Sequence, residues 1–359
     1  MSRLRVRPDR WLALAAILTL VAGLWAALLR LGWNLPWLQS NLALAHGPLM
    51  VGGFLGTLIG LERAVALGRF WAYLAPTFTA AGAVALVAGL AGPTGPLLIF
   101  LGSIVLVGVF YSIIRRQRTM FTLTMAAGAL SWAVGNALWF AGVPIPKMVH
   151  WWMAFLILTI VGERLELSRF LAPTASRQKI FVIALSLYAA GLVAMSLGVS
   201  LGHLLLGTGM VALSLWLARY DLARVTIRQK GLPRFAAVCL LGGYAWLGAG
   251  GVLAILAAHW PANVELRYDA MLHTVFLGFV FSMIFAHAPI ILPAVSGIRL
   301  PYRPVFYVHV LLLDISLIWR IGGDLGGSPS AYHWGGLFNV IAILLFLANT
   351  AYALFLGTK

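Results

Sequence analysis

The stretch HGPLMVGGFLGTLIGLER, residues 46–63, is apolar and rich in glycine, yet it begins with a histidine and ends with a Glu-Arg pair. A run of about 20 apolar residues is long enough to cross the hydrocarbon core of a bilayer as a helix. Ionisable side chains are costly inside that core, which favours placing them near the two membrane surfaces. The stretch therefore predicts a membrane-spanning helix with polar groups at both ends.

The composition extends this prediction to the whole chain. Hydrophobic residues make up 62% of the 359 residues and charged residues only 9%, which is too apolar for a soluble domain and typical of a polytopic membrane protein. We expect an all-α bundle of twelve transmembrane helices that forms a single transmembrane domain, residues 1–359. The predicted spans are 11–32, 44–66, 71–91, 95–114, 121–142, 148–167, 180–200, 202–219, 235–258, 268–294, 304–323 and 332–356.

The net charge of +16 is distributed as a topology signal. With the N-terminus in the cytoplasm, all but four of the 25 lysines and arginines fall in cytoplasmic segments; the exceptions are Arg30, Lys147, Arg267 and Arg320. This bias follows the positive-inside rule. It predicts a multi-pass protein of the bacterial inner (cytoplasmic) membrane with both termini cytoplasmic. Because topology accounts for the positive charge, no nucleic-acid partner is expected. The single cysteine, Cys239, excludes an intramolecular disulfide and a cysteine-based metal cluster.

Parts of residues 46–63 are repeated elsewhere in the chain; these similar segments are called echoes. GLERAVALGRFWAYLAP (60–76) and GERLELSRFLAP (162–173) share Gly, Glu-Arg, Arg-Phe and Leu-Ala-Pro, and they lie four spans apart. His46 and His150 begin the corresponding spans, and four spans later the tenth span carries His273 near its outer end and His287 near its inner end. The period predicts three pseudo-symmetric four-helix units, roughly 11–114, 121–219 and 235–356.

Histidines within apolar spans are candidates for cofactor binding, because neutral imidazole is a common metal ligand and an axial ligand of haem iron. The alternative for the outer histidines is hydrogen bonding to water or lipid headgroups. His273 and His287 are 14 positions apart, so on a helix they share one face about 21 Å apart. That spacing suits two stacked cofactors, as in dihaem electron-transfer proteins. His309 on the eleventh span is a candidate partner for His287, with a structural hydrogen bond as the alternative.

Ionisable residues other than histidine also lie in or beside the spans. Those that we expect to form either a proton path or structural ion pairs are Glu62, Arg63, Glu163, Arg164 and Asp314. A carboxylate at mid-membrane depth, such as Asp314, requires a partner or a proton. A hydrogen bond to a neighbouring helix and a proton path shared with His309 both satisfy that requirement.

Twelve spans in three groups of four, with histidines on the second, sixth and tenth, resemble the haem–copper oxidase superfamily. Within it, the phrases AHGPLMVGGFLGTLIGLERAVALG (45–68) and LHTVFLGFVFSMIFAH (272–287) resemble the NnrS family, whose members are haem- and copper-containing membrane proteins associated with nitric oxide stress and denitrification. The resemblance implies that His46 and His273 form the axial pair of a low-spin haem b. It also implies that His150 occupies the position of a copper ligand.

The sequence departs from the oxidases at their oxygen-reducing centre. The span 180–200 has no histidine, the tenth span has no His-x-His, and no tyrosine follows His150 at the spacing of the oxidases' cross-linked tyrosine. A terminal oxygen reductase is therefore not expected.

The sequence predicts an NnrS-like haem protein, with or without copper, that binds, senses or processes nitric oxide or a related metal–nitrosyl species. If it is an enzyme, the resemblance implies a haem-dependent oxidoreductase acting on nitric oxide. A secondary transporter with an intramembrane carboxylate/histidine site and a membrane b-type electron-transfer subunit are the alternatives. The predicted partners are the lipid bilayer and a small gaseous or small-molecule ligand, with a homo-oligomer or a redox partner left open.

Overall fold

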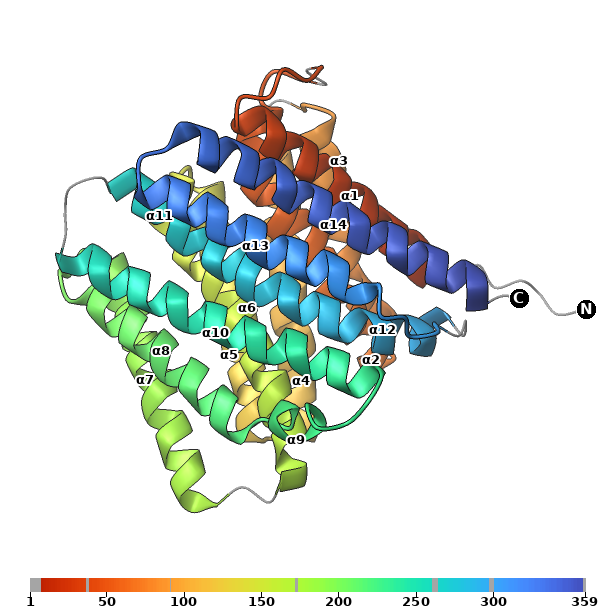
Figure 1. Ribbon diagram of the computed structural model, residues 1–359, viewed down its shortest axis with the longest axis vertical. Helices are drawn as coiled ribbons and strands as arrows, with labels where there is room; N and C mark the ends of the chain where they lie inside the picture. The colour runs from red at the N-terminus through yellow and green to blue at the C-terminus, as the bar shows by residue number, and fades with distance from the viewer. Residues whose placement is uncertain are drawn as a thin grey trace, which may run out of the picture. The chain divides into compact units, whose positions relative to one another are not determined.

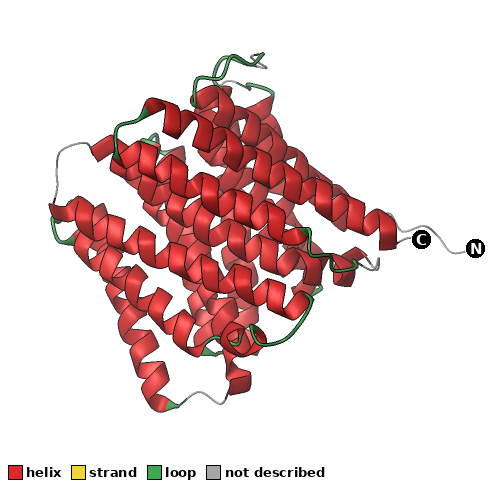
Figure 2. Ribbon diagram, viewed as in Figure 1, coloured by secondary structure: helices red, strands yellow, loops and turns green. Residues whose placement is uncertain are grey.

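The computed structural model describes residues 8–36, 39–90, 92–171, 174–259, 264–296 and 300–357. Every regular element in these ranges is helical, and they contain no strand (Figure 2). Eleven of the described helices are long and apolar enough to cross a membrane. The prediction of an all-α chain is confirmed for these residues, and the eleven helices are consistent with a multi-pass membrane protein. Basic residues Arg3, Arg5 and Arg7 of the predicted cytoplasmic N-terminus lie outside the described ranges, as do Ala172 and Pro173 of the second echo.

Contacts divide the chain into two compact units, Met1–Gly162 and Glu163–Lys359, with the boundary inside one long helix. The first unit contains α1 (Pro8–Arg30), η1 (Leu42–Ala45), η2 (Pro48–Leu55), α2 (Gly56–Leu67), η3 (Phe70–Tyr73), α3 (Leu74–Val87), α4 (Thr94–Arg116), α5 (Met120–Phe140) and most of α6 (Ile145–Ser168).

The second unit begins with the end of α6 and contains ten further elements. They are η4 (Arg169–Leu171), α7 (Ala175–Ser196), α8 (Gly202–Tyr220), α9 (Ala223–Thr226), α10 (Leu232–His259), α11 (Val264–His273), η5 (Thr274–Phe281), α12 (Ser282–Ser296), α13 (Phe306–Leu325) and α14 (Pro329–Gly357). In this unit α7 packs against α8, α8 against α10, and α13 against α14 (Figure 1).

The glycines of the opening stretch serve helix packing in the first unit. A Cβ at Gly52 would lie 2.9 Å from a side-chain carbon of Ile99 on α4, and one at Gly53 would lie 2.8 Å from the Cβ of Ala83 on α3. A Cβ at Gly56 would overlap the indole ring of Trp132 on α5. Small residues let helices approach closely in a membrane, and here neighbouring side chains fill the space that the missing side chains leave.

Two of the predicted spans contain a π-helix. The second consists of the 3-10 helix η1, the π-helix η2 and then α2, and the tenth consists of α11, the π-helix η5 and then α12. Hydrophobic periodicity does not separate these helix types, because a local change to i→i+5 hydrogen bonding leaves an apolar run unchanged in composition.

The eighth predicted span, 202–219, also differs from the expectation. It forms the helix α8, but α8 is not among the eleven helices that are long and apolar enough to cross a membrane. The physical reason is its composition, since His203 and Arg219 lie near its ends and several glycines reduce its apolar content. Eleven apolar spans, rather than twelve, are therefore established for the described residues.

Candidate functional site

Two of the predicted ligand histidines lie within two residues of the start of a π-helix. His46 follows the last residue of η1 and is separated by Gly47 from the eight-residue π-helix η2. His273 ends α11 and directly precedes η5, which is also an eight-residue π-helix. His150 lies inside the regular helix α6. Because π-helical segments are rare and occur frequently at functional sites, this local structure distinguishes His46 and His273 from the third histidine of the predicted repeat.

The side chain of His46 is oriented by α1 within the first unit. Its Nδ1 lies 2.9 Å from the carbonyl oxygen of Gly23. Because a carbonyl only accepts hydrogen bonds, Nδ1 carries the proton in a neutral ring and Nε2 becomes the basic nitrogen. Histidines that ligate metals usually donate their other N–H in this way. The geometry at His46 thus fits an iron ligand.

His273 shows the same kind of orientation in the second unit. Its Nδ1 lies 2.9 Å from the backbone oxygen of Asp269 and 3.1 Å from the Oδ2 atom of the same residue. Both are acceptors and lie closer to Nδ1 than its one neighbouring donor, Nη2 of Arg320 at 3.4 Å. Nδ1 therefore carries the proton and Nε2 is the nitrogen without one.

The Asp269 carboxylate belongs to a larger polar cluster that the sequence analysis did not identify. Arg320 on α13 donates to its Oδ2 at 2.9 Å, and the guanidinium carbon of Arg320 lies 5.0 Å from the ring centre of Tyr332 on α14. Asp324, one turn after Arg320, is 2% exposed. The available signal was spacing: Asp269 with His273, and Arg320 with Asp324, are both i,i+4 pairs in apolar helices, and such pairs share a helix face.

The second Glu-Arg pair has a different environment from the first. Arg164 donates from Nε and Nη2 to the two carboxylate oxygens of Asp221, each at 2.9 Å, and both side chains are buried. Glu163, its neighbour, is half-buried on α6. By contrast, Arg63 pairs at 3.1 Å with the adjacent Glu62, whose side chain is 41% exposed. The sequence echo therefore does not reproduce the ion pairing, and Asp221 was not among the predicted site residues.

His287 contacts the Arg164 pair rather than a second histidine. Its Nδ1 lies 2.7 Å from the carbonyl oxygen of Met283, and its Nε2 lies 3.3 Å from Nη1 of Arg164. With the proton on Nδ1, Nε2 accepts from the guanidinium. This arrangement favours a role for His287 in orienting Arg164.

The His309 side chain is surrounded by phenylalanine rings. It is 2% exposed, and the rings of Phe285 and Phe346 lie with their centroids 4.8 and 5.3 Å from its own. The Nδ2 atom of Asn349 lies 3.3 Å from Nδ1, so the amide donates and the imidazole accepts. Nε2 has no hydrogen-bond partner among the described residues. Asn349 and the aromatic rings therefore account for the contacts of this side chain.

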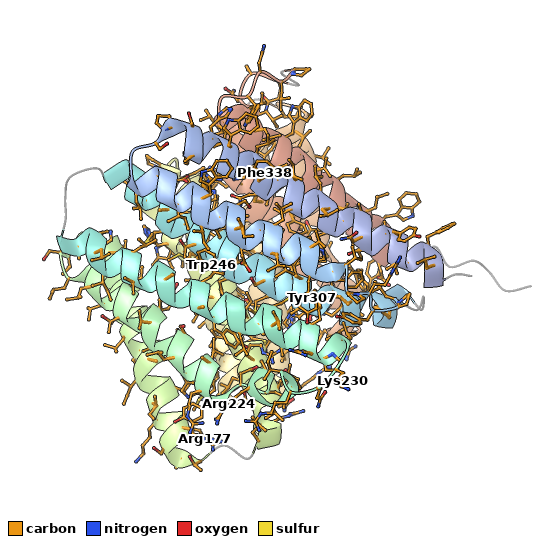
Figure 3. All side chains as sticks on the ribbon, viewed as in Figure 1. Arg177, Arg224, Lys230, Trp246, Tyr307 and Phe338 are labelled. Atoms are coloured by element: carbon orange, nitrogen blue, oxygen red, sulfur yellow. The ribbon has the colours of Figure 1, made fainter. Side chains whose placement is uncertain are left out.

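Asp314 forms a hydrogen bond to a neighbouring helix, which was one of the two ways in which its carboxylate was expected to be stabilised within the membrane. The indole Nε1 of Trp246 on α10 donates to its Oδ1 at 2.8 Å. In Figure 3 the Trp246 side chain is labelled on this helix. The carboxylate is half-buried, and its partner lies on a different helix from His309.

The structure tests in part whether these residues fit a haem. The oriented imidazoles of His46 and His273 fit the chemistry of axial ligands, and each lies in its own unit. His150 is 8% exposed on α6. The described residues contain no group of three or more His, Cys, Asp or Glu side chains placed to hold a metal ion. His46 and His273 are the residues that would hold a haem iron, each through a single imidazole.

The comparisons with known proteins place the chain in a family without a described activity. A search of curated proteins finds no match to this sequence. A family model described as a domain of unknown function (DUF8744) matches residues 10–355, so the chain belongs to this family.

Proposed function

We propose that this chain is a haem protein of the bacterial inner membrane that binds, senses or processes nitric oxide or a related metal–nitrosyl species. One observation carries the proposal: His46 and His273 lie two residues and one residue, respectively, before an eight-residue π-helix, and each has Nδ1 within hydrogen-bond distance of a backbone carbonyl. The nitric oxide assignment rests on the resemblance of residues 45–68 and 272–287 to the NnrS family. A haem iron held by both His46 and His273 would have its two axial positions filled, so binding of nitric oxide at that iron would require one of the two histidines to dissociate.

The proposed architecture has twelve spans in three pseudo-symmetric groups, with both termini in the cytoplasm. The positive-inside distribution of lysine and arginine supports that orientation. The shared placement of His46 and His273 before π-helices supports equivalence of the second and tenth spans. The third position, His150, is proposed as a copper ligand from the resemblance alone.

An optical spectrum of the full-length protein, expressed with haem supplied, tests this function. We expect a Soret band that shifts on reduction and again on addition of nitric oxide. His46→Ala and His273→Ala are each expected to lose or shift this band, whereas His203→Ala, at the start of α8, leaves it unchanged. Elemental analysis of the same samples measures iron, and comparison with His150→Ala assigns any copper. Absence of both a Soret band and iron from the wild-type protein refutes the proposal.

A secondary transporter is the second candidate, and the polar cluster around Arg320 favours it. Ionisable residues inside a membrane commonly mark substrate or ion pathways, and Asp269, Arg320 and Asp324 lie within helices apolar enough to span a bilayer. Substrate flux into proteoliposomes that is abolished by Asp324→Asn, in protein that contains no haem, would select transport over the haem proposal.

A further inference from the structure

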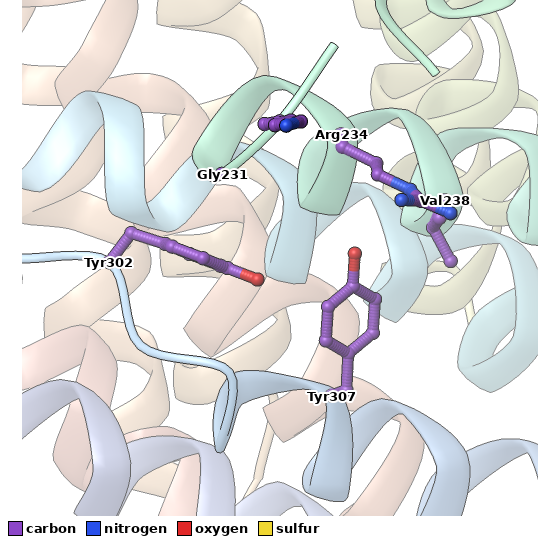
Figure 4. Close-up of a pocket in the computed structure, with 6 residues that line it drawn as sticks. Gly231, Arg234, Val238, Tyr302 and Tyr307 are labelled. Carbon is purple, nitrogen blue, oxygen red and sulfur yellow. The ribbon is translucent and has the colours of Figure 1, made fainter. Parts of the chain in front are cut away.

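A cavity of about 350 Å³ lies where the chain enters α10 and α13 in the second unit (Figure 4). Lys230, Gly231, Arg234 and Val238 line one side, and Tyr302 and Tyr307 line the other. Both helices are apolar enough to span a membrane, and the lining residues lie before these helices or within their first two turns. The cavity therefore lies at the level of a membrane surface rather than in the hydrocarbon core.

The charge of the cavity is entirely positive. Lys230 and Arg234 are exposed, and neither forms an ion pair with a carboxylate in the described part of the chain. The sequence explains why, since residues 222–264 and 270–313, which supply all the lining residues, contain no aspartate or glutamate. Two cations without a carboxylate partner favour an anionic ligand.

The phenol groups add hydrogen-bond donors to these charges. Tyr302 and Tyr307 are half-buried. The Tyr302 hydroxyl points toward Tyr307, and the Tyr307 hydroxyl points toward the helix that carries Arg234 and Val238 (Figure 4). A tyrosine hydroxyl donates a hydrogen bond to an anionic oxygen. Because the rings are held partly within the protein, their hydroxyl groups are less free to move than the ends of exposed lysines or arginines.

The start of α10 supplies a third kind of anion contact. Gly231 has φ +69°, a left-handed turn that suits glycine, and its carbonyl accepts the N–H of Phe235 at the beginning of this 28-residue helix. The first N–H groups of a long helix lack partners inside the helix and carry partial positive charge. In this turn Pro233 has no N–H and the N–H of Phe235 is bonded to Gly231, so the N–H groups of Leu232 and Arg234 are the ones that can add to the field of Lys230 and Arg234.

We propose that this cavity binds a phosphate group at the membrane surface, through Lys230, Arg234 and the hydroxyl groups of Tyr302 and Tyr307. The planar guanidinium of Arg234 and the neighbouring ammonium match the oxygens of a phosphate, which accept several charge-assisted hydrogen bonds at once. The phosphate belongs either to an anionic lipid headgroup or to a soluble phosphate. Basic pockets between transmembrane helices on the cytoplasmic side are known to hold lipid headgroups. This site is independent of the proposed haem function.

Two binding measurements on the full-length protein in detergent test the proposal. Equilibrium dialysis with radiolabelled orthophosphate measures binding of soluble phosphate. Native mass spectrometry after exposure to phosphatidylglycerol, with phosphatidylcholine as the comparison lipid, measures retention of an anionic headgroup. Binding of orthophosphate that displaces phosphatidylglycerol identifies a soluble source, and retention of phosphatidylglycerol alone identifies a lipid. Either result supports a phosphate site.

The variants distinguish a built site from a generally basic surface. Arg234→Gln is expected to weaken binding by about tenfold or more, the usual effect of losing hydrogen bonds to a charged group. Tyr302→Phe removes only one hydroxyl and is expected to weaken binding by a smaller factor. Arg228→Gln is the matched control, because it removes the same charge from an exposed position of the same loop that does not line the cavity. Equal losses in Arg234→Gln and Arg228→Gln, or no binding of either probe to the wild-type protein, overturn the proposal.

Discussion

The guanidinium of Arg164 makes two hydrogen bonds of 2.9 Å with the carboxylate of Asp221, and neither side chain is more than 5% exposed. Asp221 also accepts the backbone N–H of Ala223 at 2.7 Å, and Nη1 of Arg164 lies 3.3 Å from Nε2 of His287. These contacts connect the end of α6 with the turn after α8 and with α12. Because both ions are desolvated, each depends on its partner to remain charged at low cost.

Removal of one member of this pair is therefore expected to be strongly destabilising. Arg164→Met leaves the Asp221 carboxylate buried without its cation, and loss of one partner of a buried ion pair costs about 3–5 kcal/mol. Chemical unfolding of the detergent-solubilised protein, followed by tryptophan fluorescence, measures the change in free energy of unfolding.

Glu62→Gln provides the control for that experiment. It removes one charge from the Glu62–Arg63 pair, in which the Glu62 side chain is 41% exposed, and exposed pairs contribute about 1 kcal/mol or less. If Arg164→Met and Glu62→Gln change the free energy of unfolding by similar small amounts, the buried pair does not have the structural role inferred here.

The two Glu-Arg echoes show how far the sequence could predict the site. The motif predicted equivalent positions at Arg63 and Arg164, but not their partners, because a partner such as Asp221 comes from a segment 57 residues away. The apolar runs predicted the helices, since length and hydrophobicity determine which segments are able to span a membrane. The packing of those helices determines which polar residues contact each other, and this packing cannot be read directly from a single sequence.

For the histidines too, the sequence predicted the positions but not the local structure around them. The sequence selected His46 and His273 by position and resemblance, but it did not predict the π-helices that follow them. Both histidines have partners that are unexceptional in sequence, a glycine carbonyl for His46 and an i−4 aspartate for His273. Of these, only Asp269 was available as a signal, through its helical spacing from His273.

The hydrogen bond between Trp246 and Asp314 yields a second prediction. Its donor and acceptor lie 2.8 Å apart on α10 and α13, and hydrogen bonds between transmembrane helices contribute on the order of 1 kcal/mol. Trp246→Phe retains an aromatic ring but removes the N–H, so we expect a loss of about that size in the free energy of unfolding. Asp314→Asn keeps an acceptor oxygen and is expected to cost less. A larger loss in Asp314→Asn than in Trp246→Phe would show that the charge of Asp314, rather than this bond, matters.

Substitution of two glycines by alanine is expected to change the stability of the protein in opposite directions. A Cβ at Gly191 would overlap backbone atoms of Leu206, where α7 and α8 pack together, whereas a Cβ at Gly242 on α10 would meet nothing within 4 Å. Gly191→Ala must separate two helices, and such overpacking costs about 1–3 kcal/mol. Gly242→Ala is expected to stabilise the protein by up to about 1 kcal/mol, because alanine has the higher helix propensity. Thermal unfolding of both variants checks the signs, and destabilisation by Gly242→Ala would contradict the open space found beside it.

The proposed orientation in the membrane has a direct chemical test, because the only cysteine of the chain is buried. Cys239 is 1% exposed, so a membrane-impermeant maleimide should label the wild-type protein weakly. Lys147, in the first turn of α6, and Arg228, in the loop before α10, are exposed residues that the positive-inside rule assigns to opposite sides of the membrane. In cells with a permeable outer membrane, we expect labelling of Lys147→Cys from outside and labelling of Arg228→Cys only after the inner membrane is opened. The reverse pattern would place the basic loops outside, and with them the cavity formed by Lys230 and Arg234, where the anionic lipids of the cytoplasmic leaflet could not reach it.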